Sequence, residues 1–249
     1  AKHNEEDLSF IGCQQRVNSL SHPDLHFVYP VNTNTRVKSK ATSKHFTKEW
    51  RESVIKNPYL NLSQWLDKIE IANKQGNISV NEAEDINKIM SLKSYEGGSK
   101  LMIIWMAEKM NIAASNKLLK LIEEPPAKTI FLLITENEDQ IITTIKSRCQ
   151  ALHFPVLSEQ DIANELLLRE KCSESDALKI ATQAEGNYNK AVHLLHQDAN
   201  DLIFEQWFIA WIRTAFKAKG NAAVIQELVV WSETIAKTGR ETQKQFLDY

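Results

Sequence analysis

Two apolar runs with a helix between them constrain the fold more than any other feature of the sequence. Leu101–Met106 and Thr129–Thr135 are continuous apolar stretches of strand length, typical of strands buried on both faces of a parallel sheet. Between them, residues 111–123 carry apolar side chains at helical spacing. Pro125-Pro126 end this helix, because proline cannot continue one. The order strand, helix, strand predicts an α/β fold with a parallel sheet.

Hydrophobic periodicity and helix caps predict the remaining elements. Residues 1–30 are expected to be irregular or hairpin-like, apart from a strand at Leu25–Tyr29. Further helices are expected over residues 63–71, 80–92, 138–146, 159–170, 174–184, 188–196 and 224–235, and a third strand of the α/β rhythm over 151–154. After Pro155 only helices are predicted. We therefore expect an α/β domain over 1–155, a three-helix domain over 156–200 and a further helical domain from 201 to 249.

Composition and charge exclude several classes of protein. The 249 residues include 30 basic and 32 acidic side chains, so the net charge of −2 argues against a polybasic nucleic-acid binder. Residues 31–58 are a local exception, with seven basic against two acidic side chains, and are either a phosphate-contacting loop or a solvated insertion. No apolar run reaches the roughly 18 residues of a membrane span. Three dispersed cysteines predict no disulfide framework and favour the reduced cytoplasm.

The residues between the second strand and the third carry the candidate site. Thr135 ends the strand, and Ser147-Arg148-Cys149 follow the next helix. Arginine is a planar, permanently charged donor suited to phosphate, although spacing alone favours a surface ion pair for Arg148. Thr135 is either a functional hydroxyl or a simple strand cap. Cys149 has no His or Asp near it in the sequence, so we interpret it as a small buried side chain and not as a nucleophile.

Three motifs resemble the AAA+ subunits of clamp loaders over about residues 12–200: N-K-L-L-K-x-I-E-E-P-P at 116–126, F-L-L-I-T at 131–135 and S-R-C at 147–149. The resemblance implies an incomplete AAA+, P-loop NTPase-like sheet with helices on both faces, followed by a lid over 156–200 and the start of a helical collar over 201–249. It also implies that Arg148, within Ser147-Arg148-Cys149, is an arginine finger acting on a neighbouring subunit. Thr135 would stand at the sensor position.

The sequence departs from this family wherever a subunit handles its own ATP. It contains no G-x-x-x-x-G-K-[ST] motif, and Trp105-Met106 stand where the family carries Asp-Glu. Asn189 replaces an arginine of the lid. We therefore expect no bound cofactor in this chain, with ATP held by the neighbouring subunit, and no catalytic residue in cis. Only Cys13 is left of the four-cysteine zinc module that the family often carries, so no metal is expected either.

The resemblance predicts a clamp-loader subunit that hydrolyses no ATP itself. Its expected partners are other loader subunits of the gamma/tau and delta types, the sliding clamp, and primed DNA through its phosphates, with no membrane. Two alternatives stay open: an ATP-hydrolysing gamma/tau-like subunit with its P-loop upstream, and a stand-alone DNA-binding scaffold that uses residues 31–58. The aromatic residues Trp207, Phe208, Trp211 and Phe216 belong either to a subunit contact or to a helical core.

Overall fold

The computed structural model describes residues 11–71, 74–196, 198–217 and 222–238, together with 243, 246 and 247. It divides into two compact units, Ala1–Leu152 and His153–Tyr249, and each is described by itself. In the first unit, residues 11–18 are helical, so the expectation of an irregular or hairpin-like start was wrong. Gln14, Gln15 and Arg16 are good or adequate helix formers, and no proline precedes Pro23.

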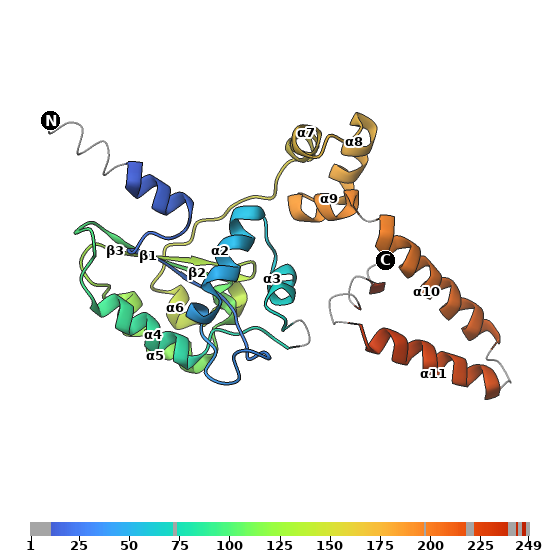
Figure 1. Ribbon diagram of the computed structural model, residues 1–249, viewed down its shortest axis with the longest axis horizontal. Coiled ribbons are helices and arrows are strands. Elements are labelled where there is room, and N and C mark those ends of the chain that lie inside the picture. Colours follow the sequence, from blue (N-terminus) through green and yellow to red (C-terminus); the bar gives the residue numbers. More distant parts are fainter. Residues whose placement is uncertain are drawn as a thin grey trace. The chain divides into compact units, whose positions relative to one another are not determined.

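A parallel three-stranded sheet forms the centre of the first unit (Figure 1). Its strands are β1 (Leu25–Val28), β2 (Lys100–Trp105) and β3 (Thr129–Ile134), in that spatial order. Leu25 of β1 pairs with Leu101 of β2, and Lys100 pairs with Thr129. The predicted α/β class with a parallel sheet is confirmed.

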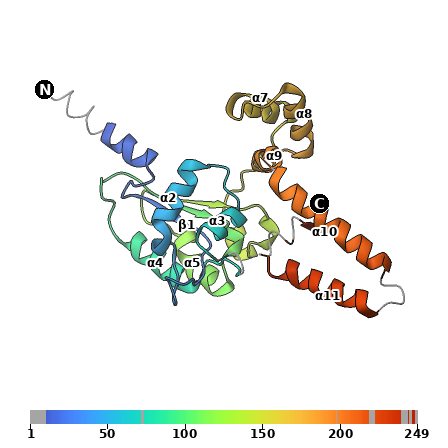
Figure 2. The same ribbon diagram turned by 45° about the vertical axis from the view of Figure 1, so that its right-hand side comes forward.

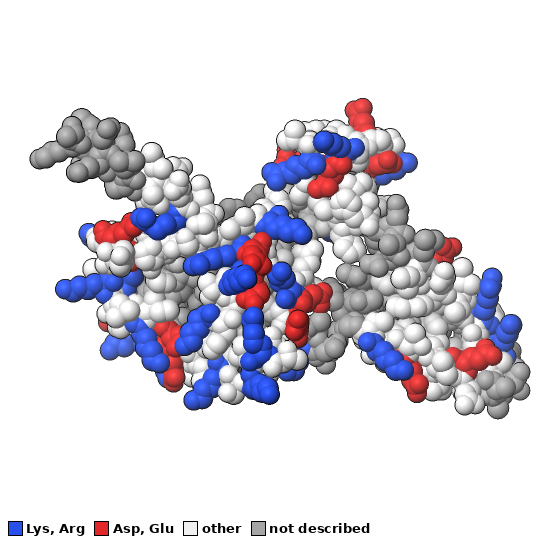
Figure 3. Space-filling view, in the orientation of Figure 1, with Lys and Arg blue, Asp and Glu red and all other residues white. Residues whose placement is uncertain are grey.

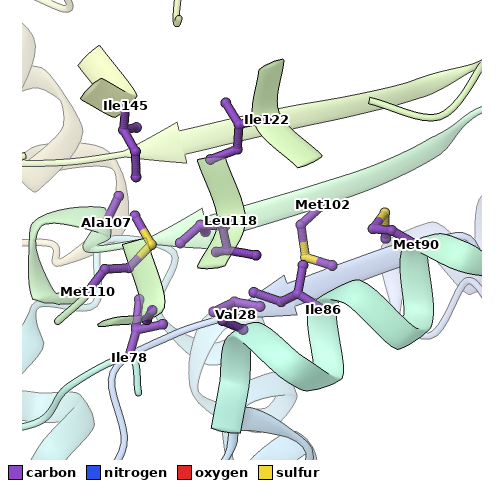
Figure 4. Packing of buried hydrophobic residues seen from close by; sticks show 13 residues of the cluster. Val28, Ile78, Ile86, Met90, Met102, Ala107, Met110, Leu118, Ile122 and Ile145 are labelled. Atoms are coloured by element: carbon purple, nitrogen blue, oxygen red, sulfur yellow. The ribbon is translucent and has the colours of Figure 1, made fainter. Parts of the chain in front are cut away.

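Helices cover both faces of the sheet, as predicted (Figures 1 and 2). On one face lie α4 (Val80–Ser91) and α5 (Ile112–Glu123), whose apolar stripes pack on alternate residues of β2. Met102, Ile86 and Leu118 meet there in the main core (Figure 4). On the other face, η1 (Ser43–Phe46), α2 (Thr47–Lys56) and α3 (Leu62–Lys68) pack against Phe27 and Trp105.

Strand β3 is buried on only one side, whereas the sequence predicted burial on both. Phe131 and Leu133 pack against the main core. On the opposite face Ile130, Leu132 and Ile134 are 52%, 44% and 47% exposed. Strand β3 is an edge strand of the described sheet, and η1, α2 and α3 cover the part of this face formed by β1 and β2. A continuous apolar run therefore did not reveal that one of its faces is exposed.

The segment after β3 is more irregular than the sequence predicted. The expected helix over 138–146 is instead a 3₁₀ turn, η3 (Glu138–Gln140), followed by a single helical turn, α6 (Thr143–Lys146). The expected strand over 151–154 is absent, and these four residues are exposed and unpaired with any described strand. A strand needs a partner for its backbone hydrogen bonds, and residues 151–154 do not pair with the free edge of β3.

The second unit contains only helices among its described residues. Three of them, α7 (Glu159–Arg169), α8 (Glu174–Gln183) and α9 (Tyr188–Leu195), enclose a small core around Ile162, Leu166 and Ala181. Two longer helices follow, α10 (Asp198–Lys217) and α11 (Ala222–Ala236), and lie side by side (Figures 1 and 2). Within the described residues, no helix combines the length and the apolar character needed to cross a membrane.

The aromatic residues of α10 divide between the two interpretations that the sequence left open. Phe204 is buried, and its ring lies 5.7 Å from that of Trp207, between ring centroids. Phe208, Trp211 and Phe216 are 45%, 42% and 82% exposed. The indole N–H of Trp231 in α11 donates to the carbonyl of Trp207, which joins the two helices. Part of this aromatic set is core, and part is available for contact.

Candidate functional site around Arg148

The chain holds Arg148 next to the main core by a short helical turn. Ile145 of α6 is only 1% exposed and packs in that core, near Ala107 and Met110 (Figure 4). The backbone N–H of Arg148 donates to the Ile145 carbonyl at 3.0 Å, so the turn continues as far as the arginine. The polar side chains Thr143, Thr144 and Lys146 leave only one residue of α6 to anchor it. Arg148 is thus a surface side chain on an anchored backbone.

Two of the three guanidinium nitrogens of Arg148 have partners in this chain. Nε lies 3.0 Å from Oε2 of Glu123, the last residue of α5. Nη1 donates to the Thr144 carbonyl at 2.8 Å, with the Ser147 hydroxyl at 3.5 Å. Nη2 has no partner among the described residues. The Arg148 and Glu123 side chains are 32% and 53% exposed, so water screens this ion pair.

Ser147 and Cys149, the residues on either side of Arg148, show no sign of a catalytic role. The Ser147 hydroxyl donates to the Thr144 carbonyl at 3.3 Å, and the Ser147 backbone N–H closes the end of α6. Cys149 is exposed, so the expectation of a buried side chain was wrong. Desolvation by neighbouring atoms still raises the pKa of its thiol above its ordinary value. A raised pKa leaves less thiolate at neutral pH, so this cysteine is a poor nucleophile.

Thr135 lies directly after β3 and makes a local contact. Its hydroxyl oxygen accepts a hydrogen bond from the Asn137 backbone N–H at 3.1 Å, which supports the turn into η3. No hydrogen bond or ion pair joins Thr135 to Arg148. The structure therefore does not bring these two sequence-predicted residues into direct contact.

The carboxyl end of β2 is filled by aromatic rings. We call Tyr29, Trp50, Trp65 and Trp105 the aromatic cluster. The Trp105 ring, at the end of β2, lies 5.2 Å from that of Trp50, between centroids. Trp50 in turn stacks on Tyr29 at 4.2 Å and meets the edge of Trp65 at 5.1 Å. Residues of the polar 31–58 stretch thus supply part of a packed core.

The residues at this end of β2 do not fit magnesium or a nucleotide phosphate. Mg²⁺ requires oxygen ligands in a nearly octahedral arrangement. Trp105 offers none, and Met106 is 3% exposed with a left-handed backbone (φ 56°). Glu108 carries the nearest carboxylate in sequence, but it is a single buried group. In the second unit, Lys190 beside Asn189 is paired with Glu185 at 2.9 Å.

One side-chain group has the composition of a metal site. Cys13, His22 and Glu96 bring their ligand atoms within 4.8 Å of one another. However, Nδ1 of His22 accepts the Asp24 backbone N–H at 3.1 Å, so the ring proton sits on Nε2. Nε2 lies 2.9 Å from Glu96 and donates to its carboxylate. A hydrogen bond accounts for this arrangement, and the expected absence of a metal stays a prediction.

The sequence interpretation missed the roles of two glutamates, Glu123 beside Arg148 and Glu82 beneath the basic stretch. Glu123 was recognised only as part of a motif, although a carboxylate at the negative end of a helix signals a nearby cation. Glu82 is 4% exposed and accepts the Ser43 backbone N–H at 2.6 Å, which ties the basic stretch to α4. Ser79 and Glu82 have the spacing of a capping box, but Ser79 makes no side-chain cap. Burial raises the pKa of Glu82 to about 7.

The family described as "DNA polymerase III, delta subunit" matches residues 1–158. The chain belongs to this family. It is 35% identical to "DNA polymerase III subunit delta'" of Haemophilus influenzae over 104 residues, which are 42% of this chain and 32% of that protein. The corresponding Escherichia coli protein is 31% identical over 123 residues, 49% of this chain and 36% of that protein. The resemblance to clamp-loader subunits is confirmed.

Related subunits and solved structures extend the comparison. "DNA polymerase III subunit tau" of Bacillus subtilis is 35% identical over 136 residues, which are 53% of this chain and 24% of that protein. A solved gamma subunit-related protein of Thermotoga maritima is 20% identical with a TM-score of 0.38, covering 69% of this chain and 57% of that one. The matched segments span between 24% and 36% of the three curated relatives.

Proposed function

We propose that this chain is a subunit of the DNA polymerase III clamp loader that donates Arg148 to ATP bound by a neighbouring subunit. One observation carries the proposal: Nη2 of Arg148 has no partner among the described residues. The arginine is partly exposed and lies on a turn that is anchored to the core. A guanidinium placed against the γ-phosphate stabilises the charge that spreads over the phosphoryl group during transfer. The contact with Glu123 does not oppose this role, because it uses Nε and leaves Nη2 available.

A non-catalytic role within the same chain is supported by the aromatic cluster. The carboxyl ends of strands are where α/β sheets usually bind ligands. Here Trp105 packs on Trp50 at that position. The nearest carboxylate in sequence, Glu108, is a single buried group, which does not supply the set of oxygen ligands that Mg²⁺ needs. The subunit would therefore tighten a ring of loader subunits around the sliding clamp and primed DNA while its neighbours hydrolyse ATP.

Substituting Arg148 tests the proposal directly. Arg148→Ala, in the full-length subunit assembled with its ATPase partners, should slow the ATP site that receives it by roughly 10³-fold. Total ATPase should fall by the share of that one site. Lys146→Ala is the matched control, since it removes a positive charge from the same turn, where Lys146 already pairs with Glu138 at 3.0 Å. Unchanged ATPase with Arg148→Ala would exclude the finger role.

An ATP-hydrolysing subunit is the second candidate, favoured by the 35% identity to subunit tau. It requires a P-loop upstream of Ala1. Titration of the full-length chain with Mg-ATP separates the two candidates, because tight binding and turnover by the isolated subunit would replace the non-catalytic proposal.

DNA contact through phosphates is the least constrained part of the proposal. Within the basic 31–58 stretch, Arg36 pairs with Glu49 at 2.7 Å and Lys44 with Asp85 at 2.8 Å. Lys38 and Lys40 are exposed and form no ion pair with a described residue. Lys and Arg side chains predominate over the visible face of the first unit, with Asp and Glu side chains between some of them (Figure 3). Capture of loader subunits by the chain, compared with its binding to DNA alone, distinguishes a loader subunit from a stand-alone scaffold.

A further inference from the structure

The last turn of α5 places negative charge where a helix disfavours it. Glu123 is the final residue of α5 and Glu124 is its C-cap. The carbonyl groups at a helix C-terminus carry partial negative charge, so carboxylates there are unfavourable and cations are favourable. Pro125 and Pro126 follow directly and restrict the backbone, so the two glutamates leave the helix at a defined place.

The two glutamates differ in what they contact. The Glu123 carboxylate lies 3.0 Å from Nε of Arg148. The Glu124 side chain makes no ion pair or hydrogen bond with a described residue, and only its backbone N–H is used, to cap α5. The same helix end thus presents one carboxylate with a described partner and one without, adjacent in sequence and both exposed.

The contacts of Arg148 fix the guanidinium from one side. Glu123 holds Nε, and the Thr144 carbonyl holds Nη1 at 2.8 Å. Because the guanidinium is planar, two fixed nitrogens determine the direction of the third. Nη2, which has no partner among the residues the structure describes, is therefore presented in a set direction. Ordering the side chain before binding reduces the entropy lost when a phosphate arrives.

We infer that Glu123 is a positioning residue for Arg148. It holds Nε so that Nη2 is presented to the phosphate of a triphosphate on another subunit, and Glu123 itself does not touch that phosphate. This inference rests on the proposed finger role of Arg148 and names the group that orients it. The Glu123 carboxylate acts on the guanidinium through its ion pair with Nε at 3.0 Å.

Substitutions at Glu123 test whether the ion pair orients Arg148. In the assembled loader, Glu123→Ala should lower kcat at the receiving site on the order of tenfold, because a misplaced reacting group loses rate. The KM for ATP should stay unchanged, because the nucleotide is bound by the other subunit. Glu123→Gln should be about as slow as Glu123→Ala, since it lacks the charge that forms the ion pair with Nε. Glu124→Ala and Glu124→Gln are the matched controls and should behave like the wild type.

Two further measurements show whether Glu123 acts through Arg148. The double variant Glu123→Ala/Arg148→Ala should be no slower than Arg148→Ala alone, because the first change acts only on the orientation of the arginine. In the ¹⁵N-labelled chain by itself, Glu123→Ala should shift the Arg148 Nε–H resonance, whereas Glu124→Ala should leave it in place. This second readout needs no loader and no ATP.

The outcomes keep this inference distinct from the proposed function. The positioning role would be overturned if Arg148→Ala slowed the ATPase of the loader but Glu123→Ala left it at the wild-type rate. The finger role of Arg148 would then still stand. A Glu123→Gln loader as fast as the wild-type loader would also overturn the positioning role, because the ion pair would then not be what orients Arg148. Wild-type ATPase with Arg148→Ala would remove the finger itself.

Discussion

The aromatic cluster and the surroundings of Arg148 differ in which side chains they bury and which they expose. In the aromatic cluster, a stretch that reads as polar and basic supplies Trp50, which is 5% exposed, and covers the carboxyl end of β2. Around Arg148, a motif that follows the apolar strand β3 leaves its charged groups exposed to water. One region serves stability at the position where related folds bind ligands, and the other has the exposure that contact with a partner requires.

Removing a ring from the aromatic cluster should have the largest effect on stability. Trp65 is fully buried, and its indole N–H donates to the Pro30 carbonyl at 2.8 Å. Trp65→Ala should lower the free energy of unfolding by about 3–5 kcal/mol, measured by urea denaturation. Arg148→Ala should change it by less than about 0.5 kcal/mol, as expected of an exposed ion pair. Equal losses in the two variants would remove the distinction between the regions.

The buried carboxylate under the basic stretch should make the stability of the protein depend on pH. Burial raises the pKa of Glu82 from 4.5 to about 7. Between these values the folded chain keeps a proton that the unfolded chain has released, so the contribution to stability is complete below pH 4.5 and is lost as the pH rises through 7. Glu82→Gln should abolish this loss, which is on the order of 2–3 kcal/mol.

Thermal or urea unfolding of the wild-type protein and of Glu82→Gln between pH 4.5 and 7 measures the difference between their free energies of unfolding. The other titrating groups are common to the two chains and cancel in the comparison. Glu84→Gln is a suitable control, because Glu84 lies two residues away on α4 and is exposed, and its pairing with Lys117 lowers its pKa. A wild-type protein whose stability stays level with that of Glu82→Gln from pH 4.5 to 7 would contradict the buried carboxylate.

The smallest expected effect concerns the outer surface of the basic stretch. If Lys38 and Lys40 contact phosphates, the double variant Lys38→Ala/Lys40→Ala should bind primed DNA more weakly in the assembled loader. The slope of log affinity against log salt should become shallower by about two. Lys44→Ala, which removes a lysine already paired with Asp85, should change the slope less. Identical slopes for all three proteins would leave this stretch as a solvated insertion.

Local pattern was sufficient for most elements of the fold. The apolar runs at 101–106 and 129–135 correspond to β2 and β3, and the periodic segment at 111–123 corresponds to α5. Such elements are predictable because burial of a regular face imposes a period on neighbouring residues. Where the period is short or absent, prediction failed: α2 lies unrecognised within the basic stretch, and residues 11–18 are helical.

The candidate site was predictable in its central residue but not in its contacts. The S-R-C motif identified Arg148, and the replacement of Asp-Glu by Trp105-Met106 was visible in the sequence. The ion pair between Arg148 and Glu123 joins residues 25 positions apart, and no local period in the sequence marks such a pair. The same holds for Glu82 and Ser43, which are 39 positions apart.

The sequence by itself determined the α/β class, the order of most elements and the arginine at the end of α6, because each depends on neighbouring residues or on a motif. Only the tertiary structure decided that β3 exposes one face, that tryptophans from a polar stretch fill the carboxyl end of β2, and which carboxylate holds Arg148. These outcomes depend on which distant segments meet, and chain proximity carries no information about that.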